Sequence, residues 1–179
     1  MSHKRSECDI RNLLDFQFDI SWQLLEYHLT EVEDEECLWR PRKTGLHVHE
    51  SDGIWWVDWP DSESYDIGPA SMAWLTWHII FWWSMVLDYS AGNGTLTREQ
   101  VPWPGNITAV REKINDLRDK WKTLVNGLSD DELSSSEKTH WPFGDKPFYE
   151  LAAWLNLELM KNASEIGYCR FLYASQKNQ

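Results

Sequence analysis

The chain has 179 residues, a formal net charge of −12 and a hydrophobic content of 42%, which together fit a folded acidic domain. Nucleic acids and anionic membranes attract basic surfaces, so this charge disfavours both as partners. We expect one domain over residues 1–179. Three widely spaced cysteines and an N-terminus without an apolar core favour a cytoplasmic protein with no signal peptide and no disulfide framework.

Four segments carry apolar residues at helical spacing. They are residues 8–30, 69–89, 106–128 and 146–174. Pro69 and Pro147 fit the first turns of the second and fourth helices, because the missing N–H of proline costs nothing there. Gly127 marks the end of the third helix. The apolar run 72–87 is shorter than the roughly 20 residues of a membrane span, so we interpret it as a buried helix.

A tryptophan-rich segment, residues 37–68, separates the first two helices. It follows an acidic tract, residues 31–36, which we interpret as a solvated connection. So long a non-helical segment is unusual in a compact domain, and it could hold a short hairpin around Ile54–Trp59 or extend over the helices. Such loops often form the rim of a site. The sequence thus predicts an all-α four-helix bundle with a long crossover connection between the first two helices.

The last helix places polar groups among its apolar residues. At about 100° per residue, Glu158, Asn162 and Glu165 fall in the middle of an apolar stripe. The members of this stripe are Leu151, Trp154, Leu155, Cys169 and Leu172. Burying a carboxylate without a partner is costly. We therefore expect a cation, a histidine or a metal opposite these three side chains.

His78 is the first candidate for that partner. It shares a helical face with Trp74 in the second helix, and a bundle can set it opposite the polar residues of the last helix. Carboxylate and histidine metal sites are built in such bundle cores. The candidate metal ligands, called the metal set below, are His78, Glu158, Asn162 and Glu165.

A buried polar network without a metal is the alternative. Lys161 lies three residues after Glu158 and four before Glu165, and both spacings suit salt bridges. The cations that could pair with the carboxylates are Arg40, Arg42, Lys161 and Arg170.

Two other groups of residues are candidates for a reactive or metal-binding site. In a strand, the rings of His47 and His49 would point to one face, but we favour a solvent-exposed loop pair over a metal site. Cys169 faces the core stripe and is interpreted as an inert thiol. Cys37 is better placed for exposure.

Four features of the chain resemble the DinB-like (YfiT-like) superfamily of metal-dependent enzymes. The first is its length and four-helix layout. Leu38-Trp39-Arg40-Pro41 is similar to the family's Trp-x-Pro segment, and residues 71–78, SMAWLTWH, look like its W-x-x-x-H run. Glu165-Ile166-Gly167, followed by Arg170 and Leu172, looks like its terminal H-x-G-x-x-x-x-x-L segment.

The resemblance implies a divalent metal, often Ni²⁺ or Zn²⁺, held by three histidines, in a dimer formed through the first helices. It also implies transfer to low-molecular-weight thiols as one activity. His78 matches the family's second-helix ligand, whereas its H-x-x-x-H in the last helix reads Lys161 and Glu165 here. A protonated lysine cannot ligate a metal. An oxygen-rich site using Glu165 with Glu158 or Asn162 would favour Mn²⁺.

Three hypotheses follow for the function. In the leading one, a cytoplasmic homodimer uses the metal set to activate a thiol or water for transfer to, or hydrolysis of, a small molecule. In the second, Lys161 neutralises the carboxylates, and the protein binds a small ligand without chemistry. In the third, the protein is a structural dimer. The residues expected to line the site are Lys161, Trp74, Trp154 and Arg40.

Overall fold

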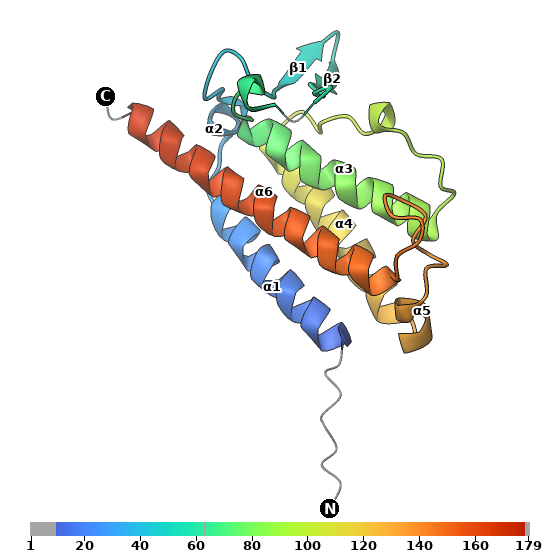
Figure 1. Cartoon of the computed structure of the whole chain (residues 1–179). Coiled ribbons are helices and arrows are strands. Elements are labelled where there is room, and N and C mark those ends of the chain that lie inside the picture. Colours follow the sequence, from blue (N-terminus) through green and yellow to red (C-terminus); the bar gives the residue numbers. More distant parts are fainter. Residues whose placement is uncertain (1–9, 63, 178–179) are drawn as a thin grey trace, which may run out of the picture.

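Four long helices make up the bundle in the computed structural model, which describes residues 10–62 and 64–177 (Figure 1). These helices are α1 (Ile10–Leu29), α3 (Met72–Ala91), α4 (Ile107–Gly127) and α6 (Phe148–Lys177). The all-α, four-helix prediction is confirmed. None of the helices in the described residues has the length and apolar character of a membrane span. His3 and Cys8 lie outside the described residues.

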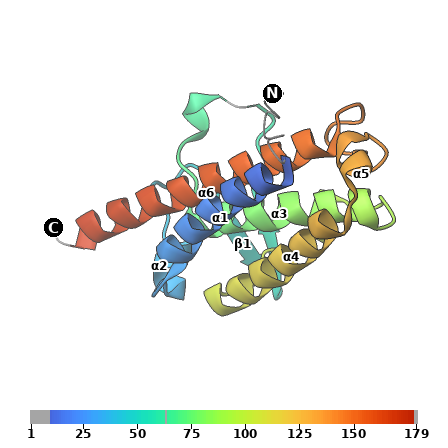
Figure 2. The same ribbon diagram turned by 90° about the horizontal axis from the view of Figure 1, so that it is seen from below.

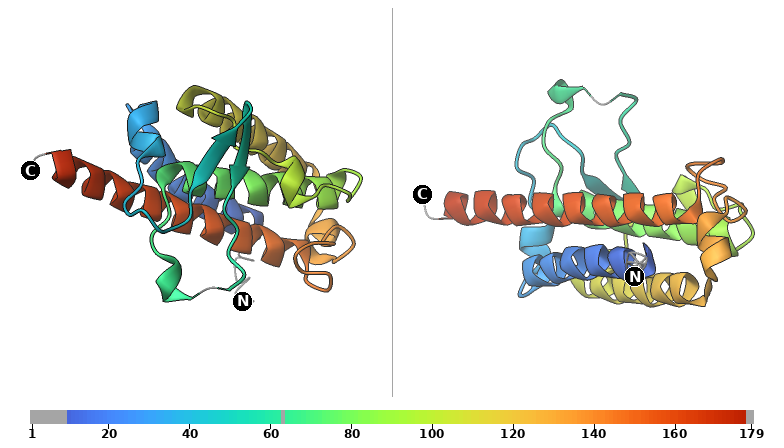
Figure 3. Two further views of the ribbon diagram at one scale, coloured as in Figure 1. Left: turned by 90° about the horizontal axis from the view of Figure 1, so that it is seen from above. Right: turned by 60° about the horizontal axis from the view of Figure 1, so that its bottom comes forward.

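The helices lie in two layers, α6 with α3 and α1 with α4 (Figure 3). Seen from below, α1 lies between α6 and α4 (Figure 2). α1 and α6 run parallel. Asn156 of α6 donates to the carbonyl of Leu14 near the starts of both helices, and Arg170 of α6 donates to the carbonyl of His28 near the end of each helix. α3 and α4 run in the opposite direction.

The connections differ in where they run. The connection between α1 and α3 begins and ends at the same end of the bundle, whereas residues 92–106 run along the bundle to the start of α4 (Figure 1). The indole N–H groups of Trp77 and Trp103 hold this second connection, donating to the Val101 carbonyl and the Thr76 hydroxyl. The segment that crosses the bundle thus joins α3 to α4.

Local side-chain caps set the helix ends. Ser71 is the N-cap of α3, its hydroxyl accepting the N–H of Trp74, so the placement of Pro69 in the first turn was wrong. Pro147 directly precedes α6, and its carbonyl accepts from Leu151. α4 ends at Gly127, as predicted.

Two arginines from other helices bind the C-terminal end of α1. Arg111 donates to the carbonyls of Leu29 and Val32, and Arg170 donates to those of His28 and Thr30. Carbonyls at this end of a helix lack intrahelical partners and carry partial negative charge. The guanidinium groups therefore join α1 to α4 and α6.

The acidic tract is structured rather than a merely solvated connection. It forms most of a short helix, α2 (Asp34–Leu38). Asp34 accepts the N–H of Ile107 at the start of α4, and Glu36 pairs with Arg170 at 2.9 Å. Cys37 is fully buried, which corrects its expected exposure, and burial raises its pKa to about 12. Burial likewise raises the pKa of Cys169 to about 11, as expected for an inert thiol.

The tryptophan-rich segment contains a hairpin, which was one of the two arrangements that we predicted for it. β1 (Val48–Ser51) and β2 (Ile54–Val57) pair antiparallel, with Val48 opposite Val57. Three further short elements complete the fold: η1 (Tyr65–Ile67), η2 (Arg98–Gln100) and α5 (Asp130–Ser134).

Candidate functional site: a cleft beside the central histidine

A segment that we call the arch, residues 58–62 and 64–70, leaves β2, projects from the helical layers and returns to α3 (Figure 3). A cleft of about 860 Å³ lies between the arch, α3 and α6. Aromatic and apolar side chains line it from the arch and α3, and charged ones from α6. The cleft brings together six side chains that the sequence singled out: Arg42, Trp74, His78, Glu158, Lys161 and Glu165.

His78 lies at the inner wall of the cleft and is only 7% exposed. Trp82 donates its indole N–H to Nε2 of His78 at 2.8 Å. Because an indole nitrogen can only donate, Nε2 carries no proton. Nδ1 therefore holds the proton and donates it to Oδ1 of Asn162 at 3.0 Å. The amide of Asn162 in turn donates to the backbone carbonyl of Glu158 at 2.7 Å.

Burial keeps the imidazole neutral. It lowers the pKa of His78 to about 4, the hydrogen bond that His78 donates to Asn162 opposes that shift, and the charge of Lys161 adds to it. Trp74 stacks on the ring, with centroids 4.7 Å apart and an interplanar angle of 19°. His78 is thus held in one tautomer and one orientation.

The charged wall of the cleft consists of three residues on successive turns of α6. Lys161 contacts Glu158 at 2.6 Å, with the Glu158 side chain 18% exposed. Glu165 makes no hydrogen bond or ion pair within the residues that the structure describes. Partial burial raises the pKa of Glu165, while Lys161 lowers it and Glu158 raises it.

The polar residues of the last helix are therefore only partly where we predicted them. Asn162 is in the core, 1% exposed. Glu158 and Glu165 lie at the edge of the stripe and line the open cleft, so their prediction as core carboxylates was wrong. The physical reason is that a carboxylate at the edge keeps contact with water, whereas an amide satisfied by His78 and a carbonyl can be buried.

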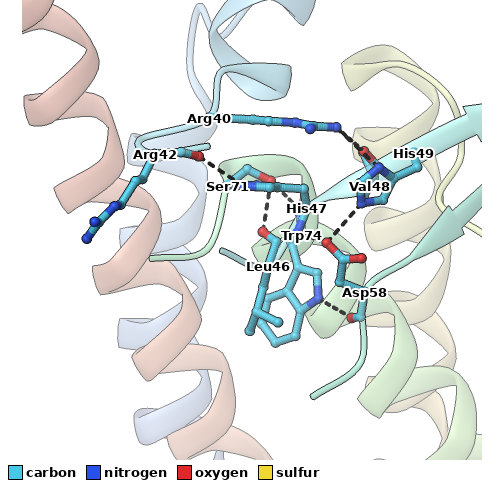
Figure 4. Close-up of polar contacts among 9 residues, drawn as sticks. All are labelled: Arg40, Arg42, Leu46, His47, Val48, His49, Asp58, Ser71 and Trp74. Carbon is cyan, nitrogen blue, oxygen red and sulfur yellow. Dashed lines mark hydrogen bonds and ion pairs between the residues drawn. The ribbon is translucent and has the colours of Figure 1, made fainter. Parts of the chain in front are cut away.

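Two residues expected to line the site lie elsewhere. Trp154 meets Trp82 edge-on at 4.8 Å and contacts Phe143, so it supports the cleft from behind. Arg40 is exposed and hydrogen-bonds to the hairpin (Figure 4). Neither of these two residues lines the cleft.

The metal set does not fit a metal ion in this structure. Nε2 of His78 accepts from Trp82, Nδ1 is protonated, and Glu158 is bound by Lys161. Across residues 10–62 and 64–177, no group of three or more His, Cys, Asp or Glu side chains is arranged to hold one. The ammonium of Lys161 would also repel a divalent cation at this wall.

The two other histidines of interest, His47 and His49, both contact Asp58, which is itself hydrogen-bonded to α3 (Figure 4). His47 is 2% exposed, and its Nε2 hydrogen-bonds to the carbonyl of Arg42. Oδ2 of Asp58 accepts the His47 N–H and pairs with Nε2 of His49, both at 2.9 Å. Trp74 donates to the Asp58 carbonyl at 2.8 Å. The expectation of a solvent-exposed histidine pair was therefore wrong.

Sequence reasoning did not identify the roles of two residues that organise the site. Trp82 lies four residues after His78 and shares its helical face, but that spacing does not show that its indole N–H is bonded to Nε2 of His78. Asp58 directly follows β2, which contains Trp55 and Trp56, and no pattern in the sequence marks Asp58 as the anchor of the hairpin.

These features define a helical-bundle protein with a lateral cleft beside a neutral central histidine. Comparison with protein families matches residues 17–166 to the DinB superfamily. The chain therefore belongs to the DinB superfamily. No curated protein and no solved structure matches it.

The neutral state of His78 gives a testable pH dependence. Its pKa is 6.5 in an unstructured chain and about 4 in the fold, so between these values only the unfolded chain binds the proton. This group should therefore cost about 2 kcal/mol of stability when the pH falls from 7 to 5. We expect His78→Gln to lose less stability over this interval by about that amount, measured by urea unfolding at both pH values. Equal losses in the two proteins would show that His78 is not held neutral.

Proposed function

We propose that this DinB-superfamily protein binds an organic small molecule in the cleft and does so without a metal. The cleft itself carries the proposal, because a volume of about 860 Å³ lies within the usual range of small-molecule sites. Its lining combines apolar and aromatic side chains with polar and charged ones. Of the function hypotheses drawn from the sequence, this is the second.

The arrangement of His78 supports a binding role over a metal-dependent one. A metal would have to displace the N–H of Trp82 from Nε2, and Glu158 would have to leave Lys161. Both contacts are short. In each of them a metal would take a hydrogen bond away from a side chain that is partly shielded from water. The metal-dependent transferase or hydrolase hypothesis therefore rests on family membership alone.

Metal independence predicts that Ni²⁺, Zn²⁺ and Mn²⁺ leave the melting temperature unchanged, because a ligand stabilises only the state that binds it. A matched positive control is the triple variant Trp82→Phe, Lys161→His, Glu165→His. It frees Nε2 of His78 and supplies two further imidazoles, so Ni²⁺ should raise its melting temperature. Stoichiometric metal in the native protein, purified without chelator or affinity metal, would restore the enzyme hypothesis.

Ligand binding in the cleft can be tested with indole, a flat apolar probe. We expect binding by calorimetry, and we expect Ala70→Phe to abolish it by filling the cleft that Ala70 lines. Ala109→Phe is the matched control, since Ala109 lines a separate groove between α3 and α4. If the Ala70→Phe variant still binds indole, the indole site lies outside this cleft.

We also propose that the protein forms a homodimer through α1 and α6. Large exposed apolar side chains follow one stripe on each helix: Leu13, Phe16, Ile20 and Tyr27 on α1, and Leu157, Tyr168 and Phe171 on α6. α1 and α6 pack side by side (Figure 1), and at helical spacing both stripes flank the seam between them. Extended apolar surface of this kind marks an interface.

Phe16→Glu tests the dimer, because Phe16 is 62% exposed and a carboxylate there would be buried on association. We expect a monomer in sedimentation experiments. Tyr65→Glu, on the fully exposed tip of the arch, should leave the mass unchanged. A native protein that sediments as a monomer at all concentrations would refute the dimer.

A further inference from the structure

The charged wall of the cleft contains one carboxylate, Glu165, that has no hydrogen-bond or ion-pair partner among residues 10–62 and 64–177. Lys161 neutralises Glu158 at 2.6 Å. Glu165, one turn further along α6, makes no hydrogen bond or ion pair within the described part of the chain, yet it lines the same cleft. Glu165 is exposed to the cleft and can accept from a cationic donor, and charge-assisted hydrogen bonds are the strong ones.

The opposite walls suit a flat apolar body that carries a positive charge. Trp59, Trp74 and Trp82 line the cleft from the arch and α3. Indole rings bury large apolar areas and attract cations to their faces. The tryptophan wall thus suits the aromatic part of a ligand, and the charged wall suits its cationic part.

An anionic ligand would find less support in the cleft. It would meet the carboxylates of Glu158 and Glu165, and of Asp61 on the arch. The ammonium of Lys161 is already bound to Glu158. The remaining cation in the lining is Arg42, an exposed residue that precedes the hairpin.

We propose that the cleft binds an arylalkylamine, with the protonated amine on the Glu165 carboxylate and the aromatic body against the tryptophan wall. The inference rests on the proposed binding function and names the class of its ligand. In this arrangement Glu165 selects a cationic ligand, and the tryptophans contact its aromatic body.

Three indoles with matched side chains test this inference by calorimetry on the full chain at pH 7. Tryptamine carries an ammonium, tryptophol a neutral hydroxyl and indole-3-propionate a carboxylate. We expect tryptamine to bind about tenfold more tightly than tryptophol, the usual order for a hydrogen bond between charged groups, and the acid to bind most weakly.

Glu165→Gln should reduce the affinity for tryptamine to that for tryptophol and leave the affinity for tryptophol unchanged. The matched control is Glu150→Gln, because Glu150 lies on the same helix but pairs with Lys146 outside the cleft. It should leave all three affinities unchanged. Circular dichroism and the melting temperature would establish that both variants fold.

The outcomes separate this inference from the proposed function. Equal affinities for the three indoles, all abolished by Ala70→Phe, would overturn the amine preference and retain the binding cleft. Tightest binding of the acid would likewise overturn the amine preference, and it would indicate that Arg42 selects the charge of the ligand. If none of the three binds, both the ligand class and the binding function fail.

Discussion

The hydrogen bond from the indole of Trp82 to Nε2 of His78, 2.8 Å long, constrains the whole centre of the bundle. It places the single proton of the ring on Nδ1, and that proton requires an acceptor in the core. Asn162 supplies the acceptor and is itself oriented by the Glu158 carbonyl. One donor on α3 thus fixes the tautomer of His78, its partner on α6 and the relative rotation of the two helices. Any displacement of one helix against the other would leave a buried polar group without a hydrogen bond.

Trp74 extends that constraint to the outer part of the molecule. One face of its ring stacks on His78, and its N–H holds the Asp58 carbonyl after the hairpin. Asp58 in turn fixes His47 and His49. The arch therefore begins from a rigid anchor beside the histidine, which gives the cleft a defined shape although its outer wall is a loop. A ligand that contacts Trp74 would touch the same side chain that positions the hairpin.

The sequence predicted the helices well and the site less well. Apolar spacing located all four helices to within a few residues, because burying one face of a helix imposes that spacing whatever the neighbours are. The same spacing put Glu158 and Glu165 in the core with Asn162. Periodicity gives the angle of a residue about its helix axis but not how far the neighbouring elements extend over it. The arch covers this side of α6 only loosely, so the carboxylates meet a cleft and the amide meets α3.

Sequence alone thus determined the fold class, the resemblance to the DinB superfamily and the unusual Lys161 and Glu165 at positions where the family pattern has histidines. These are properties of residue order and helical period. Tertiary structure decided that the indole of Trp82 covers Nε2 of His78, that Lys161 pairs with Glu158, and that the long segment after α1 stands beside α3 and α6 as the wall of a cleft. Each of these depends on contacts between side chains and backbone groups at particular distances, which the helical period does not encode.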